Sequence, residues 1–152
     1  MPRRTSNAPD PKTQALKLLA RREHSVRELK RKLTARGITD DDAASAVANA
    51  TAEGWQSDSR YAELLVRSRV AHGYGPVRIR AELEVAGVPA DEIQAALDAA
   101  DVDWREQAVA AHAKKFGAVP ATSAERAKQY RYLQGRGFDG SQINAALKGE
   151  DL

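Results

Sequence analysis

The chain repeats itself every fifty residues, and this repeat restricts its fold more than any other feature. The segments LTARGI, LEVAGV and LQGRGF occupy residues 33–38, 83–88 and 133–138. Each has a leucine, a glycine and an apolar residue at the same positions: Leu33, Leu83 and Leu133; Gly37, Gly87 and Gly137; Ile38, Val88 and Phe138. Repeats of roughly 20–50 residues are typical of stacked supersecondary units, so three tandem units are predicted.

Each unit is predicted to contain three helices. Apolar residues recur with helical spacing, as in Tyr61, Leu64 and Leu65, and no segment alternates as a strand does. The expected helices are 13–23, 25–36 and 40–53, then 59–72, 76–86 and 90–100, then 103–116, 123–136 and 140–148. The predicted fold is therefore all-α, an elongated array of repeats at 13–54, 55–102 and 103–152 after a flexible basic tail at 1–12.

Several helix ends carry recognisable signals. Pro76 suits the first turn of a helix, and Gly87 suits a left-handed C-cap. Ser25 with Glu28, and Thr122 with Glu125, have the spacing of capping boxes.

One position breaks the repeat. Gln129 stands where the other units have Leu29 and Ile79. We therefore expect the third repeat to pack in a shifted register around Tyr130 and Tyr132.

Units of fifty residues are close to the lower size limit for independent folding. Neighbouring repeats are therefore predicted to share a core, so that stability depends partly on nearest-neighbour contacts. Trp55 and Trp104 fall between units and are predicted to fill the joints. For both, a core role is favoured over a ligand-stacking role.

Positive charge is concentrated at the start of the chain. Residues 1–36 carry eleven Lys or Arg against three acids, a net charge of +8, whereas the remainder carries thirteen against eighteen, a net charge of −5. Such a cluster indicates an anionic partner, either nucleic acid or an acidic protein groove. The alternative is a solvated face with helical pairs such as Glu28–Lys32. The candidate partner-binding residues of this cluster are Arg21, Arg22, Arg27, Lys30 and Arg31.

Four arginines of the second repeat are further candidates. Arg78 and Arg80 each have a glutamate four residues later, so pairing within the helix explains them as well as function does. Arg67 and Arg69 have no such partner downstream.

The sequence offers no catalytic constellation, and an enzyme, a cofactor and a metal site are not expected. His24, His72 and His112 are predicted to be surface groups at helix ends, and Asp40–Asp42 to be acids that oppose a helix dipole. The chain contains no cysteine, which fits a reducing cytoplasm. No stretch is long and apolar enough to suggest a membrane span, and residues 1–12 do not resemble a signal peptide.

The segment DSRYAELLVRSRVAHGYGPVRIRAELEVAGV at 58–88 resembles the most characteristic part of the RecX family, regulators of the RecA recombinase. ALKLLARREHSVRELKRKL at 15–33 resembles the family's opening repeat, and KKFG at 114–117 with YLQGRGF at 132–138 resembles its third. Two residues depart from the family pattern. Gln129 stands where the family usually has an apolar residue, and Tyr61 stands where it more commonly has Phe. The matching motif residues in the middle repeat are Asp58, Tyr61, Ala62, Arg69, Gly73, Gly75, Pro76, Ile79, Glu82 and Leu83.

This resemblance implies a curved, all-helical protein of the cytoplasm. It implies binding to RecA, in the groove of the RecA–DNA filament, and suppression of ATP hydrolysis and strand exchange, with consequences for DNA repair and the SOS response. We expect a monomer that does not bind membranes. Direct DNA binding through the basic first repeat is the alternative.

Overall fold

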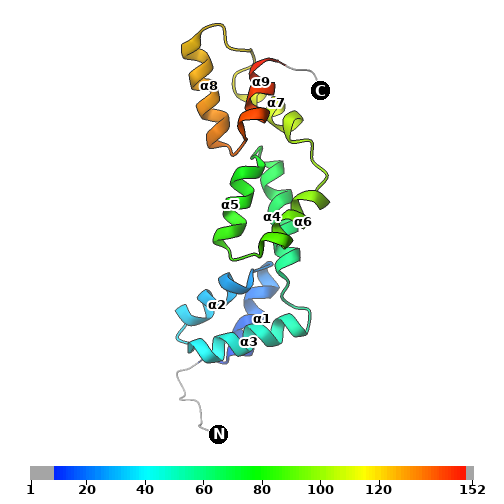
Figure 1. Cartoon of the computed structure of the whole chain (residues 1–152). Helices are drawn as coiled ribbons and strands as arrows, with labels where there is room; N and C mark the ends of the chain where they lie inside the picture. Colours follow the sequence, from blue (N-terminus) through cyan, green and yellow to red (C-terminus); the bar gives the residue numbers. More distant parts are fainter. Residues whose placement is uncertain (1–8, 150–152) are drawn as a thin grey trace.

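The structure is a computed structural model that describes residues 9–149, and these residues form nine helices without a strand (Figure 1). Every helix lies within two residues of its expected bounds. The helices are α1 (Pro11–Arg21), α2 (Val26–Ala35), α3 (Asp40–Ala52), α4 (Asp58–Ala71), α5 (Pro76–Val85), α6 (Ala90–Ala99), α7 (Trp104–Lys115), α8 (Ser123–Gly135) and α9 (Gly140–Leu147).

Helix α1 begins earlier than predicted because Asp10 caps it. The Asp10 carboxylate accepts a hydrogen bond from the Thr13 backbone N–H at 2.9 Å. Pro11 and Lys12, which the sequence placed in a flexible tail, are therefore helical. The predicted tail otherwise falls largely on residues 1–8, which lie outside the described residues.

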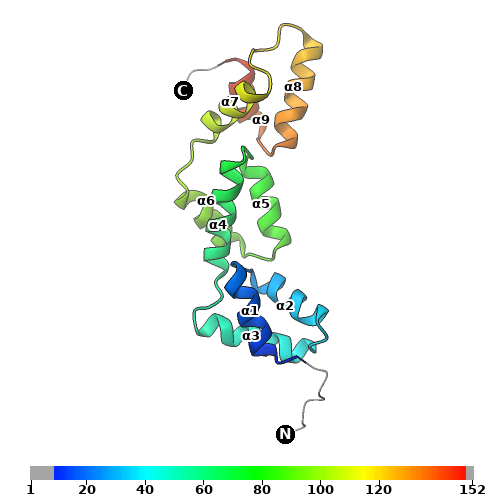
Figure 2. The ribbon, with the colours of Figure 1, turned by 180° about the vertical axis from the view of Figure 1, so that it is seen from behind.

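Three three-helix units follow one another in an elongated row (Figure 1). Each helix packs mainly against the other two helices of its own unit. The second helices of the units, α2, α5 and α8, lie along the same edge of the row in both views (Figures 1 and 2). The repeat in the sequence therefore becomes a repeat of surfaces along this edge.

The repeated leucine, glycine and apolar residue together end the second helix of each unit. Gly37, Gly87 and Gly137 have φ of 89°, 83° and 97°, which confirms the left-handed cap predicted at Gly87 and shows the same cap in the other two repeats. The next residue donates its N–H to the repeat leucine's carbonyl, as Val88 does to Leu83 at 3.0 Å. This is the Schellman arrangement, so the LxxxG-apolar pattern marks a helix end.

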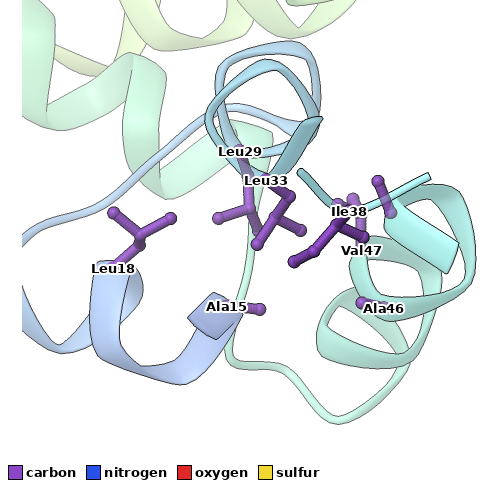
Figure 3. Packing of buried hydrophobic residues seen from close by; sticks show 8 residues of the cluster. Ala15, Leu18, Leu29, Leu33, Ile38, Ala46 and Val47 are labelled. Atoms are coloured by element: carbon purple, nitrogen blue, oxygen red, sulfur yellow. The ribbon is translucent and has the colours of Figure 1, made fainter. Parts of the chain in front are cut away.

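Each unit has its own hydrophobic core, contrary to the prediction of a shared one. The first core contains Leu18, Leu29, Leu33 and Val47, which converge from all three helices of the unit (Figure 3). The second and third clusters are made in the same way from α4–α6 and from α7–α9. Hydrogen bonds at helix ends and the packing of Trp104 against the second core connect the units.

The two tryptophans do not play equal roles. Trp104 is half-buried against the second core, as a joint filler would be. Trp55 does not fill a joint, since 37% of it is exposed and the Lys12 ammonium lies 5.6 Å from its ring centroid.

The sequence had suggested that Gln129 shifts the packing register of the third repeat. This prediction is wrong. It is buried at the position of Leu29 and Ile79, and its amide oxygen accepts a hydrogen bond from His112 Nε2 at 2.7 Å. His112 is also buried, four residues after the fully buried Ala108, just as Val66 follows Ala62. A polar pair thus replaces the aliphatic pair of the second repeat, and each member satisfies the other.

The prediction of surface histidines is wrong for His24 and His112 and right for His72, which is exposed. His24 is only 1% exposed. Its Nδ1 lies 2.9 Å from the Arg22 carbonyl oxygen and its Nε2 lies 2.9 Å from Lys32 Nζ. Because a carbonyl can only accept and an ammonium can only donate, His24 is neutral and carries its proton on Nδ1.

Two predicted capping boxes are half formed. Ser25 Oγ and Thr122 Oγ1 each accept the expected backbone N–H, but Glu28 pairs with Arg22 and Glu125 accepts from the Ala121 N–H. A reciprocal box, which the sequence analysis missed, joins Asp139 and Gln142.

Candidate functional site

The first and second repeats meet where the C-terminus of α5 reaches the N-terminus of α2. Ser25 Oγ donates to the Ala86 carbonyl at 2.8 Å, and Arg27 Nη1 donates to the Val85 carbonyl at 3.3 Å. The Cβ that Gly87 lacks would lie 3.0 Å from Arg27 Cβ, so glycine allows this close approach. We call this contact region the first joint.

Asp58 and Gln56 fasten the same joint from its other side. Asp58 Oδ1 accepts from the Val26 N–H at 2.9 Å and from Gln56 Nε2 at 3.0 Å. Gln56 is 1% exposed and also donates to the His24 carbonyl at 3.2 Å. Asp58, a motif residue of the resemblance, therefore caps the start of α2 from another repeat.

A hollow of about 440 Å³ opens beside the first joint, between α2, α4 and α5. We call it the arginine groove. Tyr61 and Leu65 form part of its wall, together with Glu28 and Glu82. It brings together four of the arginines that the sequence singled out, from three helices of two repeats: Arg27, Arg31, Arg69 and Arg78.

The two carboxylates that line the groove each hold a guanidinium group. Glu28 is held by both terminal nitrogens of Arg22 at 2.9 Å, and Glu82 is held by Arg69 at 2.8 and 3.0 Å. Arg69 has no glutamate four residues later in the sequence, and Glu82 reaches it instead from the neighbouring helix α5. Arg78 lies 3.9 Å from Glu82, the i,i+4 contact that the sequence had offered. Bidentate pairs fix the planes of both guanidinium groups.

The surroundings of the groove shift the pKa values of Glu28, Arg69 and Tyr61. Burial raises the pKa of Glu28, but the hydrogen bond and charge of Arg22 outweigh it, so the pKa lies below its ordinary value. The hydrogen bonds that Arg69 donates to Glu82 raise the pKa of Arg69. Burial, and then the charge of Glu28, raise the pKa of the Tyr61 phenol. The groove therefore presents four arginines, of which Arg69 is held in place by Glu82, beside the Tyr61 hydroxyl.

The other candidate residues lie outside the arginine groove. Arg67 lines a different hollow, between α4 and α6, which it shares with Glu63. Arg80 donates to Gln94 Oε1 rather than pairing with Glu84. Lys30 is half-buried on α2, and Arg21 is exposed at the end of α1.

We call the region where the second and third repeats meet the second joint, and it has a basic hollow that the sequence does not predict. Its volume is about 510 Å³, and its lining includes His72, Lys114, Lys115 and Arg136 but no carboxylate. Tyr132 belongs to the same lining, with Lys115 Nζ 5.3 Å from its ring centroid. Lys114 and Lys115, the KK of KKFG, could have indicated a basic site from the sequence. The residues that complete it, His72 and Arg136, come from the ends of α4 and α8.

The motif glycines of the second repeat shape this joint. Gly73 has a φ of 79°, and Gly75 is buried against Gly137. Pro76 occupies the first turn of α5, as predicted, and Leu83 is fully buried in the second core.

Within residues 9–149, no cluster of three or more His, Cys, Asp or Glu side chains is placed to hold a metal ion. In the same part of the chain, no helix has the length and apolar character needed to cross a membrane. What the described surface offers is a set of oriented cations beside apolar and aromatic side chains, an arrangement suited to binding.

Comparison with solved structures shows that the fold is shared. The chain superposes on the crystal structure of RecX from Lactobacillus salivarius with a TM-score of 0.76 at 21% identity, covering 91% of this chain and 92% of that one. A crystal structure of a regulatory protein RecX gives the same TM-score at 20% identity, over 93% of this chain and 73% of that chain.

Sequence comparison extends the likeness to close relatives. Residues 12–48, 57–97 and 101–147 match the family models of the first, second and third three-helix domains of RecX. The chain is 49% identical over 139 residues to the regulatory protein RecX of Stenotrophomonas maltophilia (strain R551-3), covering 91% of this chain and 85% of that protein. It is 48% identical to that of Xanthomonas axonopodis pv. citri (strain 306), covering 91% and 86%. These matches, together with the three-repeat fold, establish that the chain belongs to the RecX family of regulatory proteins.

Proposed function

We propose that this chain binds the RecA recombinase, free and as a filament on single-stranded DNA, and inhibits its ATPase, recombinase and coprotease activities. It thereby modulates DNA repair and the SOS response, acting as a monomer in the cytoplasm. Membership of a family whose curated members are named regulatory protein RecX supports this proposal.

The arginine groove is the observation that carries the proposal. Arg27 and Arg31 come from the first repeat, and Arg69 and Arg78 come from the second. A partner seated in the groove contacts both repeats at once, and an elongated body with similar units suits a partner that also repeats along its length. Several modest contacts on one rigid body then combine into strong binding.

Direct DNA binding remains the second candidate. The net charge of +8 over residues 1–36 favours it, since phosphate contacts from Lys and Arg supply most non-specific affinity for DNA. The two readings predict different selectivity. A DNA binder interferes with every enzyme that uses the same DNA, whereas a RecA binder interferes with RecA alone.

Charge reversal in the groove tests the site. Arg31 is exposed and lines the groove, so Arg31→Glu should change the free energy of unfolding by less than about 0.5 kcal/mol. We expect it to raise the concentration needed to inhibit RecA's DNA-dependent ATPase by about five- to tenfold at low salt. Arg67, a candidate that lines a different hollow, takes the same charge change in Arg67→Glu and should lose less inhibition than Arg31→Glu. Equal losses in both variants would reject the groove.

A parallel assay separates the two functions. RecA and an unrelated DNA-dependent ATPase are compared at equal DNA and salt concentrations. Selective inhibition of RecA supports the proposal, and equal inhibition of both enzymes supports the DNA-binding alternative.

A further inference from the structure

Helix α5 exposes three apolar side chains in a row, Val77, Ala81 and Val85, spaced four residues apart. Val77 is 54% exposed and Val85 is 76% exposed, and Ala81 is exposed between them. The opposite face of the same helix carries Ile79 and Leu83, which are fully buried. Helix α5 therefore has one apolar face in the core and a second in solvent. We call Val77, Ala81 and Val85 the α5 ridge.

The fifty-residue repeat shows that this ridge is specific to the middle unit. The equivalent positions are Arg27, Arg31 and Ala35 on α2, and Ala127, Arg131 and Gly135 on α8. Arg27 and Arg31 line one hollow together with Ala81 and Val85, and Arg131 occupies the equivalent position of α8, whose helix lies along the same edge as α2 and α5 (Figures 1 and 2).

The ridge also separates two hollows. Ala81 and Val85 line the arginine groove. Val77 and Ala81 line a hollow of about 400 Å³ on the other side, which contains Arg80, Glu84 and Asp139. Exposed valines with polar and charged groups on both sides have the anatomy of a protein interface, an apolar centre within a polar rim.

This pattern distinguishes between classes of partner. A nucleic-acid backbone is an unbroken row of phosphates, and a surface that follows it benefits from cations along its whole length. Valines at the centre of the edge contribute nothing to phosphate binding. They stabilise a complex only when a partner buries them, which favours a protein with apolar side chains.

We propose that the α5 ridge is the apolar centre of the RecA-binding surface, and that it receives a segment of RecA with apolar side chains between carboxylates. The apolar side chains of that segment cover Val77 and Val85, and its carboxylates face Arg27, Arg31 and Arg78. This assignment rests on the proposed function and adds the ridge, which carries no charge, to the arginine groove.

Neutral substitutions test the ridge without altering charge. The double variant V77S/V85S replaces two exposed valines, and V119S replaces a 51% exposed valine in the loop after α7. Circular dichroism and thermal unfolding confirm the fold of each variant, and V85S alone provides a milder change.

Binding to RecA is measured without DNA, beside binding to single-stranded DNA. We expect V77S/V85S to weaken RecA binding by at least about tenfold, because burial of a valine contributes on that scale. V119S should bind RecA as the wild type does, and all variants should bind DNA equally.

The double variant V77R/V85R sharpens the distinction, because it extends positive charge across the centre of the edge. The proposal predicts weaker RecA binding despite tighter DNA binding. Failure of the wild type to bind RecA without DNA would overturn the proposed function itself. If the wild type binds RecA and V77S/V85S binds it equally well, only the role of the α5 ridge is overturned. Stronger inhibition of RecA by V77R/V85R than by the wild type would also overturn that role.

Discussion

The two joints of the molecule place neighbouring repeats in the same register with different chemistry. At the first joint, the side chains of Ser25 and Arg27 donate to the carbonyls of Ala86 and Val85. At the second, the backbone itself donates, from Gly75 N–H to the Arg136 carbonyl at 2.8 Å and from Val77 N–H to the Gly137 carbonyl at 2.9 Å. Ser25 and Gly75 are equivalent, fifty residues apart, and both are N-caps of a second helix.

The difference teaches how each joint tolerates change. Where side chains make the contacts, the backbones stay far enough apart to accommodate a Cβ on Ser25. Where backbones touch, they exclude it, since a Cβ on Gly75 would lie 2.4 Å from the Gly137 carbonyl oxygen. The second joint is further closed by Tyr74, whose ring lies 4.0 Å from the Arg78 guanidinium and 3.8 Å from that of Arg136. We therefore expect the second joint to be the more sensitive to small substitutions.

The largest expected effect is that of Gly75→Ala. The added methyl group meets backbone atoms that have no rotamer to change, so the two repeats must separate, and the substitution should cost about 3 kcal/mol. Chemical unfolding measures the loss. Gly135→Ala is the matched control, because no atom lies within 4 Å of its missing Cβ and its φ is not positive. That control should be neutral or stabilising by up to about 1 kcal/mol. Equal stability of Gly75→Ala and the wild type would mean that the second joint is loose.

A smaller effect is expected where a glycine faces a side chain. Gly87→Val should cost at least about 1 kcal/mol, because a β-branched residue is poor at positive φ. Gly37→Val bears the same backbone penalty at a φ of 89°, but nothing lies within 4 Å of its missing Cβ. Gly87→Val should therefore lower the thermal midpoint further than Gly37→Val. Identical shifts would show that Arg27 moves aside without cost and that the first joint absorbs the change.

The smallest expected effect is on the pH dependence of stability, and it arises from His24, which lies at the first joint. Burial lowers the pKa of His24, and the charges of Lys32 and Arg22 lower it further. A histidine that protonates more readily in the unfolded chain contributes its full stability above about pH 6.5 and loses it as the pH falls toward the folded-state pKa. The wild type should therefore lose stability between pH 7.5 and 5.5 more steeply than His24→Gln, as thermal unfolding would measure. Parallel curves for the two proteins would contradict this role.

The sequence predicted the features that depend on residues only a few positions apart. The helix bounds, the three glycine caps and the Arg78–Glu82 contact all follow from spacings of a few residues. The Arg69–Glu82 pair was missed because its members stand thirteen residues apart on α4 and α5. His24 and Gln129 were misjudged for a related reason. A polar residue can be buried when a distant group satisfies it, and here the satisfying groups are Lys32 and His112.

By itself, the sequence determined that this protein is three repeats of three helices, because the fifty-residue pattern encodes a core leucine and a glycine cap in each unit. Tertiary structure decided how the units are joined and which side chains meet. Val77, Ala81 and Val85 have the same helical spacing as Ile79 and Leu83, and periodicity gives both sets an apolar face. Only the placement of α4 and α6 against one face of α5 buried Ile79 and Leu83 and left the ridge in solvent, beside four arginines brought together across the first joint.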